Sequence, residues 1–163
     1  MPDRRFLLVA SLLAGLGLST SCSDNPTEPV LATEFTATLN GANERPTGNS
    51  STASGVATVT IVSENSLTFT VTVANLTNIT AGHIHVGSAA VAGAVIVGLA
   101  PATLPTGTFT GTFNSGTITT ATMATAPVTM ASLLALIRNG DAYVNVHTTA
   151  FPGGEIRGQL VPK

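Results

Sequence analysis

"GVATVTIVSENSLTFTVTV", residues 55–73, alternates apolar and polar side chains on both sides of a short polar break. In residues 66–73 every second position is Leu, Phe or Val, and the positions between them are mostly Thr. A period of two puts the apolar side chains on one face of a β-strand and the threonines on the other. The break "SEN" (63–65) fits a tight connection. The stretch therefore predicts two half-buried strands joined as a hairpin.

Similar short segments, mostly separated by turn residues, recur along the chain and bring the total to about eight strands. Strands at this spacing indicate a sandwich or barrel. We expect an all-β protein, specifically an antiparallel Greek-key, immunoglobulin-like β-sandwich. The further expected strands are 34–40, 81–87, 94–99, 107–113, 141–148 and 154–160.

One segment has a different pattern. "TMASLLALIRNG" (129–140) carries apolar residues at helical spacing and ends in Gly140, a common helix stop. Thr129 or Ser132 can serve as the N-cap. We expect a single short helix near 129–139 that covers one end or edge of the sandwich.

The composition excludes several classes of protein. Only 9% of the 163 residues are charged, 44% are hydrophobic, and the chain has 16 Gly, 9 Pro and no Trp. Such a chain is neither a charged helical bundle nor a disordered segment. The net charge is −2 and the basic residues form no cluster. Nucleic-acid binding needs a positive patch, so no nucleic-acid partner is expected.

The N-terminus has the pattern of a bacterial lipoprotein signal. Arg4 and Arg5 precede an apolar run over 6–18, and small residues then lead to Cys22, the only cysteine. We predict that 1–21 is a signal peptide and that Cys22 is lipidated. The alternative is an ordinary cleaved signal that leaves a free thiol.

The rest of the chain then divides in two. Residues 22–33 are polar, contain two prolines and are expected to be a tether. Residues 34–163 are expected to be the folded β-sandwich domain. The lipid would hold the protein on a membrane of the cell envelope, on its periplasmic or surface face.

Three histidines are the candidates for chemistry. On a strand, His83 and His85 project from one face, and in "YVNVH" His147 shares a face with Tyr143 and Asn145. If the two strands are neighbours, three imidazoles converge. Such a set suits one copper or zinc ion with an open fourth position.

A structural network is the competing interpretation of this polar face. Neutral imidazoles both donate and accept hydrogen bonds, and satisfied polar networks fix strand register without any chemistry. A patch that recognises another protein is a third interpretation. The predicted network partners are Glu44, Tyr143, Asn145, Thr148, Glu155 and Arg157.

Three blocks of this sequence resemble the CHRD domain, a module of extracellular proteins. They are "LNGANERPTG" (39–48), "TAGHIHVGSAAVAGAVIVGL" (80–99) and "AYVNVHTTAFPGGEIRGQL" (142–160). The resemblance implies a secreted or surface β-sandwich module and no settled biochemical activity.

We find no nucleophile or phosphate-loop motif and expect no catalytic residue. The expected function is a non-enzymatic binding or structural module. The alternatives are a mononuclear copper or zinc protein, which would allow redox chemistry, and adhesion through threonine-rich strand faces.

Overall fold

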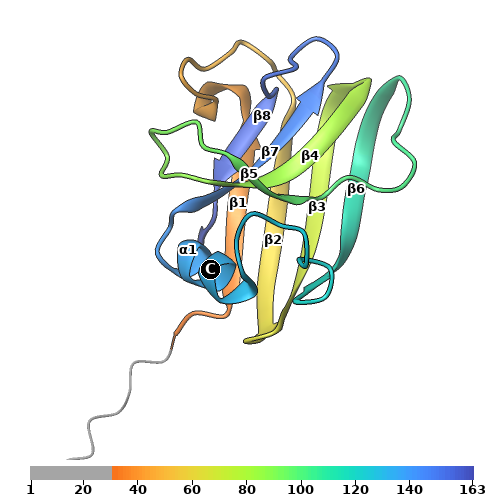
Figure 1. Cartoon of the computed structure of the whole chain (residues 1–163). Helices are drawn as coiled ribbons and strands as arrows, with labels where there is room; N and C mark the ends of the chain where they lie inside the picture. Colours follow the sequence, from red (N-terminus) through yellow and green to blue (C-terminus); the bar gives the residue numbers. More distant parts are fainter. Residues whose placement is uncertain (1–30) are drawn as a thin grey trace, which may run out of the picture.

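The computed structural model describes residues 31–163, and Figure 1 shows their arrangement. The expected signal peptide 1–21, Cys22 and the tether up to residue 30 lie outside this part. Within residues 31–163, no helix has the length and apolar character needed to cross a bilayer. The strands are β1 (Glu34–Asn40), β2 (Ser54–Ser63), β3 (Ser66–Thr77), β4 (Ile79–Val86), β5 (Val95–Gly98), β6 (Thr108–Thr119), β7 (Ala142–Thr148), β8 (Ile156–Gln159) and β9 (Val161–Pro162).

The strands form one antiparallel hydrogen-bonded sheet in the order β5-β4-β7-β8-β1-β2-β3-β6, and β9 pairs with β1. The predicted all-β antiparallel fold with one helix is confirmed. The immunoglobulin-like Greek-key sandwich of two sheets is not. The two four-stranded halves are joined where Asn40 of β1 pairs with Arg157 of β8, so the sheet curls as a half-barrel.

The predicted hairpin is present as β2 and β3, and its apolar side chains share one face. Val59 pairs with Phe69 and Ala57 with Val71, and all four side chains are buried. The threonines between them face away from the core, where Thr58 lies opposite Thr70. One face of the hairpin therefore supplies the hydrophobic core, and the other faces solvent.

A single residue carries the chain from one half of the sheet to the other. β3 ends at Thr77 beside β6, and β4 begins at Ile79 beside β7. Asn78 between them has φ 55°, in the left-handed region that asparagine tolerates better than most residues. Its side-chain oxygen accepts a hydrogen bond from the backbone N–H of Gly107 at 3.1 Å. This corner closes the curl and brings β4 next to β7.

The predicted helix is present as α1 (Met130–Arg138). Thr129 is its N-cap, and its hydroxyl accepts a hydrogen bond from the backbone N–H of Ser132 at 3.2 Å. Gly140 follows the helix with φ 74°, as a helix stop requires. α1 lies at one end of the curled sheet, beside the C-terminus (Figure 1). Its buried side chains, which join the core, are Met130, Leu133, Leu134 and Ile137.

Candidate metal centre

The pairing of β4 with β7 places the three histidines. His85 lies opposite Tyr143, His83 opposite Asn145 and Ala81 opposite His147. The intervening Ile84, Val144 and Val146 are fully buried in the core. The histidines therefore project from the outer face of this half of the sheet, and the small side chain of Ala81 leaves room beside His147.

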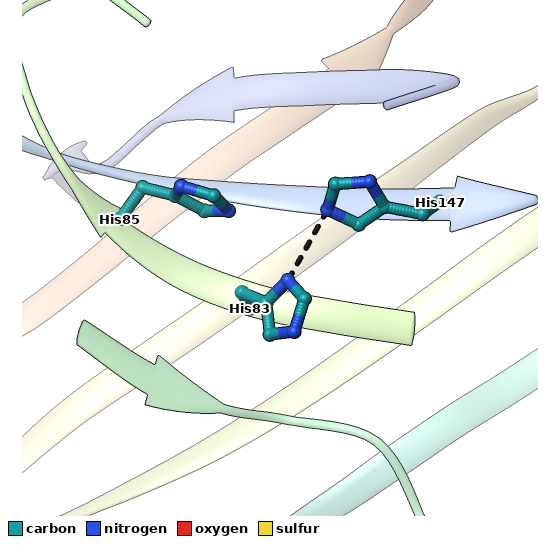
Figure 2. A group of neighbouring side chains, drawn as sticks. All are labelled: His83, His85 and His147. Carbon is teal, nitrogen blue, oxygen red and sulfur yellow. Dashed lines mark hydrogen bonds between the residues drawn. The ribbon is translucent and has the colours of Figure 1, made fainter. Parts of the chain in front are cut away.

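The three imidazoles converge, as Figure 2 shows. The Nδ1 atom of His83 lies 3.1 Å from the Nε2 atom of His147. One nitrogen from each of His83, His85 and His147 lies within 4.8 Å of the corresponding nitrogens of the other two. The sequence predicted that the three imidazoles would converge if their strands were neighbours. β4 and β7 are neighbours, and the imidazoles do converge. A group of this size can hold one metal ion.

Two backbone carbonyls fix the tautomers of two of the rings. His85 donates from Nδ1–H to the carbonyl oxygen of Gly93 at 3.0 Å, and His147 donates from Nδ1–H to that of Pro152 at 3.0 Å. Because a carbonyl only accepts, both rings carry their proton on Nδ1 and a lone pair on Nε2. The lone pair of His147 accepts a hydrogen bond from Nδ1–H of His83 at 3.1 Å, and that of His85 has no partner. Protein ligands of metals are usually held in this way by an outer partner.

Two buried polar atoms on this face have no hydrogen-bond partner among the described residues, Nε2 of His85 and Oδ1 of Asn145. His85 is only 8% exposed, and its Nε2 is buried without a hydrogen-bond partner among the described residues 31–163. A buried acceptor without a partner loses its hydration for no compensating bond. A cation bound between the three rings would supply the missing partner.

The site keeps its imidazoles neutral. Burial, together with the smaller effects of the adjacent His147 and His85, lowers the pKa of His83 to about 4. Burial also lowers the pKa values of His85 and His147, although their bonds to Gly93 and Pro152 oppose the shift. Near pH 7 all three rings are therefore neutral. Because His83 donates from Nδ1–H to Nε2 of His147, its proton has to move from Nδ1 to Nε2 before Nδ1 can bind a metal.

Tyr143 packs against the ring of His85, and Arg157 packs against Tyr143. The Tyr143 ring stacks on His85 with centroids 4.8 Å apart, and the Arg157 guanidinium lies 3.4 Å from the Tyr143 centroid. Arg157 also donates to the carbonyl oxygens of Ser88 and Val91 at 2.9 and 2.8 Å. The loop between β4 and β5 is thus tied to the side chains that hold the triad.

The predicted acidic partners bind other side chains. Glu44 accepts a hydrogen bond from Asn145 Nδ2 at 2.7 Å, and burial raises the Glu44 pKa to about 7 against the opposing charge of Arg157. Glu155 accepts from the hydroxyls of Ser51 and Thr148. Within residues 31–163 the histidine rings bond to one another and to carbonyls, and no hydrogen bond joins them to Glu44, Glu155 or Arg157.

Two anchors of the site were not found in the sequence. The carbonyls of Gly93 and Pro152 carry no side-chain signature. For Gly93 the residue type itself is the signal, because a glycine in a loop can mark a position where a side chain does not fit. A Cβ at this position would overlap the carbonyl oxygen of Val86. The Gly93 N–H also donates to the Tyr143 hydroxyl at 3.0 Å.

The fold and the site define an all-β module that carries a histidine triad on the outer face of one half of its sheet. The sequence model of the CHRD domain family matches residues 35–160, so this chain belongs to the CHRD domain family. The resemblance seen in the three sequence blocks is therefore confirmed. No curated protein and no solved structure matches the chain.

Proposed function

We propose that this chain is an exported, lipid-anchored module of the cell envelope with a non-enzymatic binding or structural role. Membership in the CHRD family, which is not a known family of enzymes, supports the role. The charged start, the apolar run 6–18 and the single Cys22 support export and anchoring. The membrane is then a partner through the lipid on Cys22.

The sequence also limits how the module is stabilised. Its only cysteine is Cys22, so residues 34–163 contain no disulfide. The described domain relies instead on a core that runs through both halves of the sheet and α1. A core of this extent suits a tethered domain that folds by itself outside the cytoplasm.

Lipid labelling tests the anchoring. The full chain is expressed in a bacterial host supplied with an alkyne-tagged fatty acid, and the envelope is then fractionated. We expect the wild type to carry the label and to sediment with membranes, and Cys22→Ala to lose both properties. A Cys22→Ala variant that remains labelled would contradict the proposal.

A second candidate function is the binding of one copper or zinc ion by His83, His85 and His147. The observation that carries it is the convergence of three neutral imidazoles, two of them fixed by carbonyls, around the unpartnered Nε2 of His85. Three nitrogen donors with an open fourth position are typical of exchangeable or catalytic sites and not of closed structural ones.

Calorimetric titration of the purified full chain with Cu²⁺ and Zn²⁺ tests this second function. We expect binding of one ion per chain for the wild type and for Thr58→Ala, a control on the other half of the sheet. His147→Ala should bind at least tenfold more weakly because one donor is removed. Unchanged binding by His147→Ala would exclude the triad as the site.

A further inference from the structure

We infer that the triad is built for copper in the cuprous state, held by three nitrogens in the plane through the three ring centroids, and not for tetrahedral zinc. The inference rests on the second function proposed above, the binding of one metal ion. It adds the identity of the ion and its coordination, and both follow from the spacing of the rings.

The ring positions match a single central ion. The ring centroids are 5.4 Å apart for His83 and His85, 5.0 Å for His83 and His147, and 6.1 Å for His85 and His147. The point in their plane that is equidistant from all three lies about 3.2 Å from each centroid. A metal–nitrogen bond of about 2.0–2.1 Å, with about 1.2 Å from nitrogen to ring centre, places an ion about 3.2–3.3 Å from a centroid. An ion at that point is therefore at bonding distance from each ring, and the donor nitrogens, which lie within 4.8 Å of one another, turn toward it on binding.

The same spacing argues against a tetrahedral ion. Tetrahedral angles at these bond lengths require every pair of centroids to lie about 5.2 Å apart. The pairs that include His83 are near that value, but the pair of His85 and His147 is wider at 6.1 Å. Around the in-plane point the three angles are about 102°, 114° and 143°. This is a flattened, three-coordinate arrangement.

The positions of the donor atoms also favour a three-coordinate ion. The candidate donor nitrogens are Nδ1 of His83 and Nε2 of His147, 3.1 Å apart, and the unpartnered Nε2 of His85. Binding moves the proton of His83 from Nδ1 to Nε2 and replaces its hydrogen bond to His147. At bonds of about 2.0–2.1 Å, an angle near 102° puts two nitrogens about 3.2 Å apart, close to the observed separation. Three neutral nitrogens are a complete set for Cu⁺, a closed-shell ion that accepts three ligands in a plane. Zinc almost always takes four.

The surrounding structure resists a change to tetrahedral geometry. His85 is held between the Gly93 carbonyl and the Tyr143 ring, and His147 is held by the Pro152 carbonyl. Moving these two rings closer together would break one of these contacts. The nearby carboxylates do not offer a fourth ligand, because Glu44 is bound to Asn145 and Glu155 to Ser51 and Thr148.

Competition and X-ray absorption on the full chain test the inference. Cu⁺ is titrated anaerobically against bicinchoninate, and Zn²⁺ against a chromophoric chelator. We expect Cu⁺ to bind at one ion per chain at least 100-fold more tightly than Zn²⁺, with three nitrogen neighbours in the absorption spectrum. His83→Ala should lose the site. Glu44→Gln changes a buried carboxyl on the same face without removing a donor, and it should keep the Cu⁺ affinity within about twofold.

The outcomes separate the inference from the function on which it rests. Zinc binding as tight as copper binding, or a four-coordinate bound copper, would overturn the inference and leave metal binding intact. Failure of the wild-type chain to bind either ion would overturn both. Circular dichroism of His83→Ala checks that its loss of binding is not a loss of fold, and His83 is the suitable position because it is only half-buried.

Discussion

The Nδ1 atom of His83 on β4 lies 3.1 Å from the Nε2 atom of His147 on β7, although 64 residues separate the two histidines in the chain. They meet as diagonal neighbours, because Asn145 lies opposite His83 and Ala81 lies opposite His147 in the strand pairing. Diagonal pairs on paired strands are within reach of aromatic side chains. The contact therefore depends on the corner at Asn78, which brings β4 beside β7.

Metal binding should stabilise the folded chain. An ion that binds only the folded state at 100 times its dissociation constant adds about 2.7 kcal/mol to the free energy of unfolding. We expect thermal unfolding of the wild type to move to higher temperature with one equivalent of copper. His83→Ala should not respond, and Thr58→Ala should respond like the wild type. An equal shift in His83→Ala would place the stabilising ion elsewhere.

Gly93 should be intolerant of any side chain. A Cβ there would overlap the Val86 carbonyl oxygen, whereas a Cβ at Gly98 meets no atom within 4 Å. We expect Gly93→Ala to lower the free energy of unfolding in urea by about 1–3 kcal/mol and to weaken metal binding, because Gly93 anchors His85. The matched Gly98→Ala should cost less than about 1 kcal/mol. Equal costs would show that the loop adapts to a side chain.

Glu44 should shape the pH dependence of stability. Its folded pKa of about 7 lies above the ordinary 4.5, so its protonation favours the folded state as the pH falls from about 7 to 4.5. The histidines act oppositely, because their lowered pKa values remove stability as the pH falls from 6.5 toward 4. In urea unfolding across this range, Glu44→Gln should lose stability on acidification more steeply than the wild type. Parallel curves would show that Glu44 does not titrate near pH 7.

The helix should contribute to the core on one side only. Leu134 of α1 is fully buried, whereas Leu136 is half-buried on the same helix. We expect Leu134→Ala to cost about 2–5 kcal/mol of unfolding free energy, the usual cost of a large cavity. Leu136→Ala, a matched change, should cost clearly less. A reversed order would mean that α1 packs against the sheet through a different face.

Local patterns predicted the elements better than their arrangement. The alternation in 55–73 gave the hairpin, and the helical spacing in 129–140 gave α1. The joining of both halves into one sheet depends on the pairing of Asn40 with Arg157. These two residues are far apart in the sequence, and no local pattern of side chains marks their pairing. The expected strand 154–160 is shorter as β8, and β9 follows it as a separate strand beside β1.

For the site, face alternation predicted which side chains share a surface but not what they bind. The shared face of Tyr143, Asn145 and His147 follows from the period of two. Within the described residues no hydrogen bond joins the histidines to Glu44, Glu155 or Arg157, because each acid bonds to a hydroxyl or amide partner instead. The carbonyls that orient His85 and His147 belong to loops, and loop paths are not encoded in residue periodicity.

Nitrogen NMR of histidine-labelled chain during titration with Cu⁺ tests the central claim most directly, because each ring nitrogen is observed separately. The structure predicts that at one equivalent Nδ1 of His83 and Nε2 of both His85 and His147 shift together, while the Nδ1–H groups held by Gly93 and Pro152 remain protonated. A titration in which fewer than three rings respond, or in which the anchored Nδ1 atoms bind the ion, would contradict it.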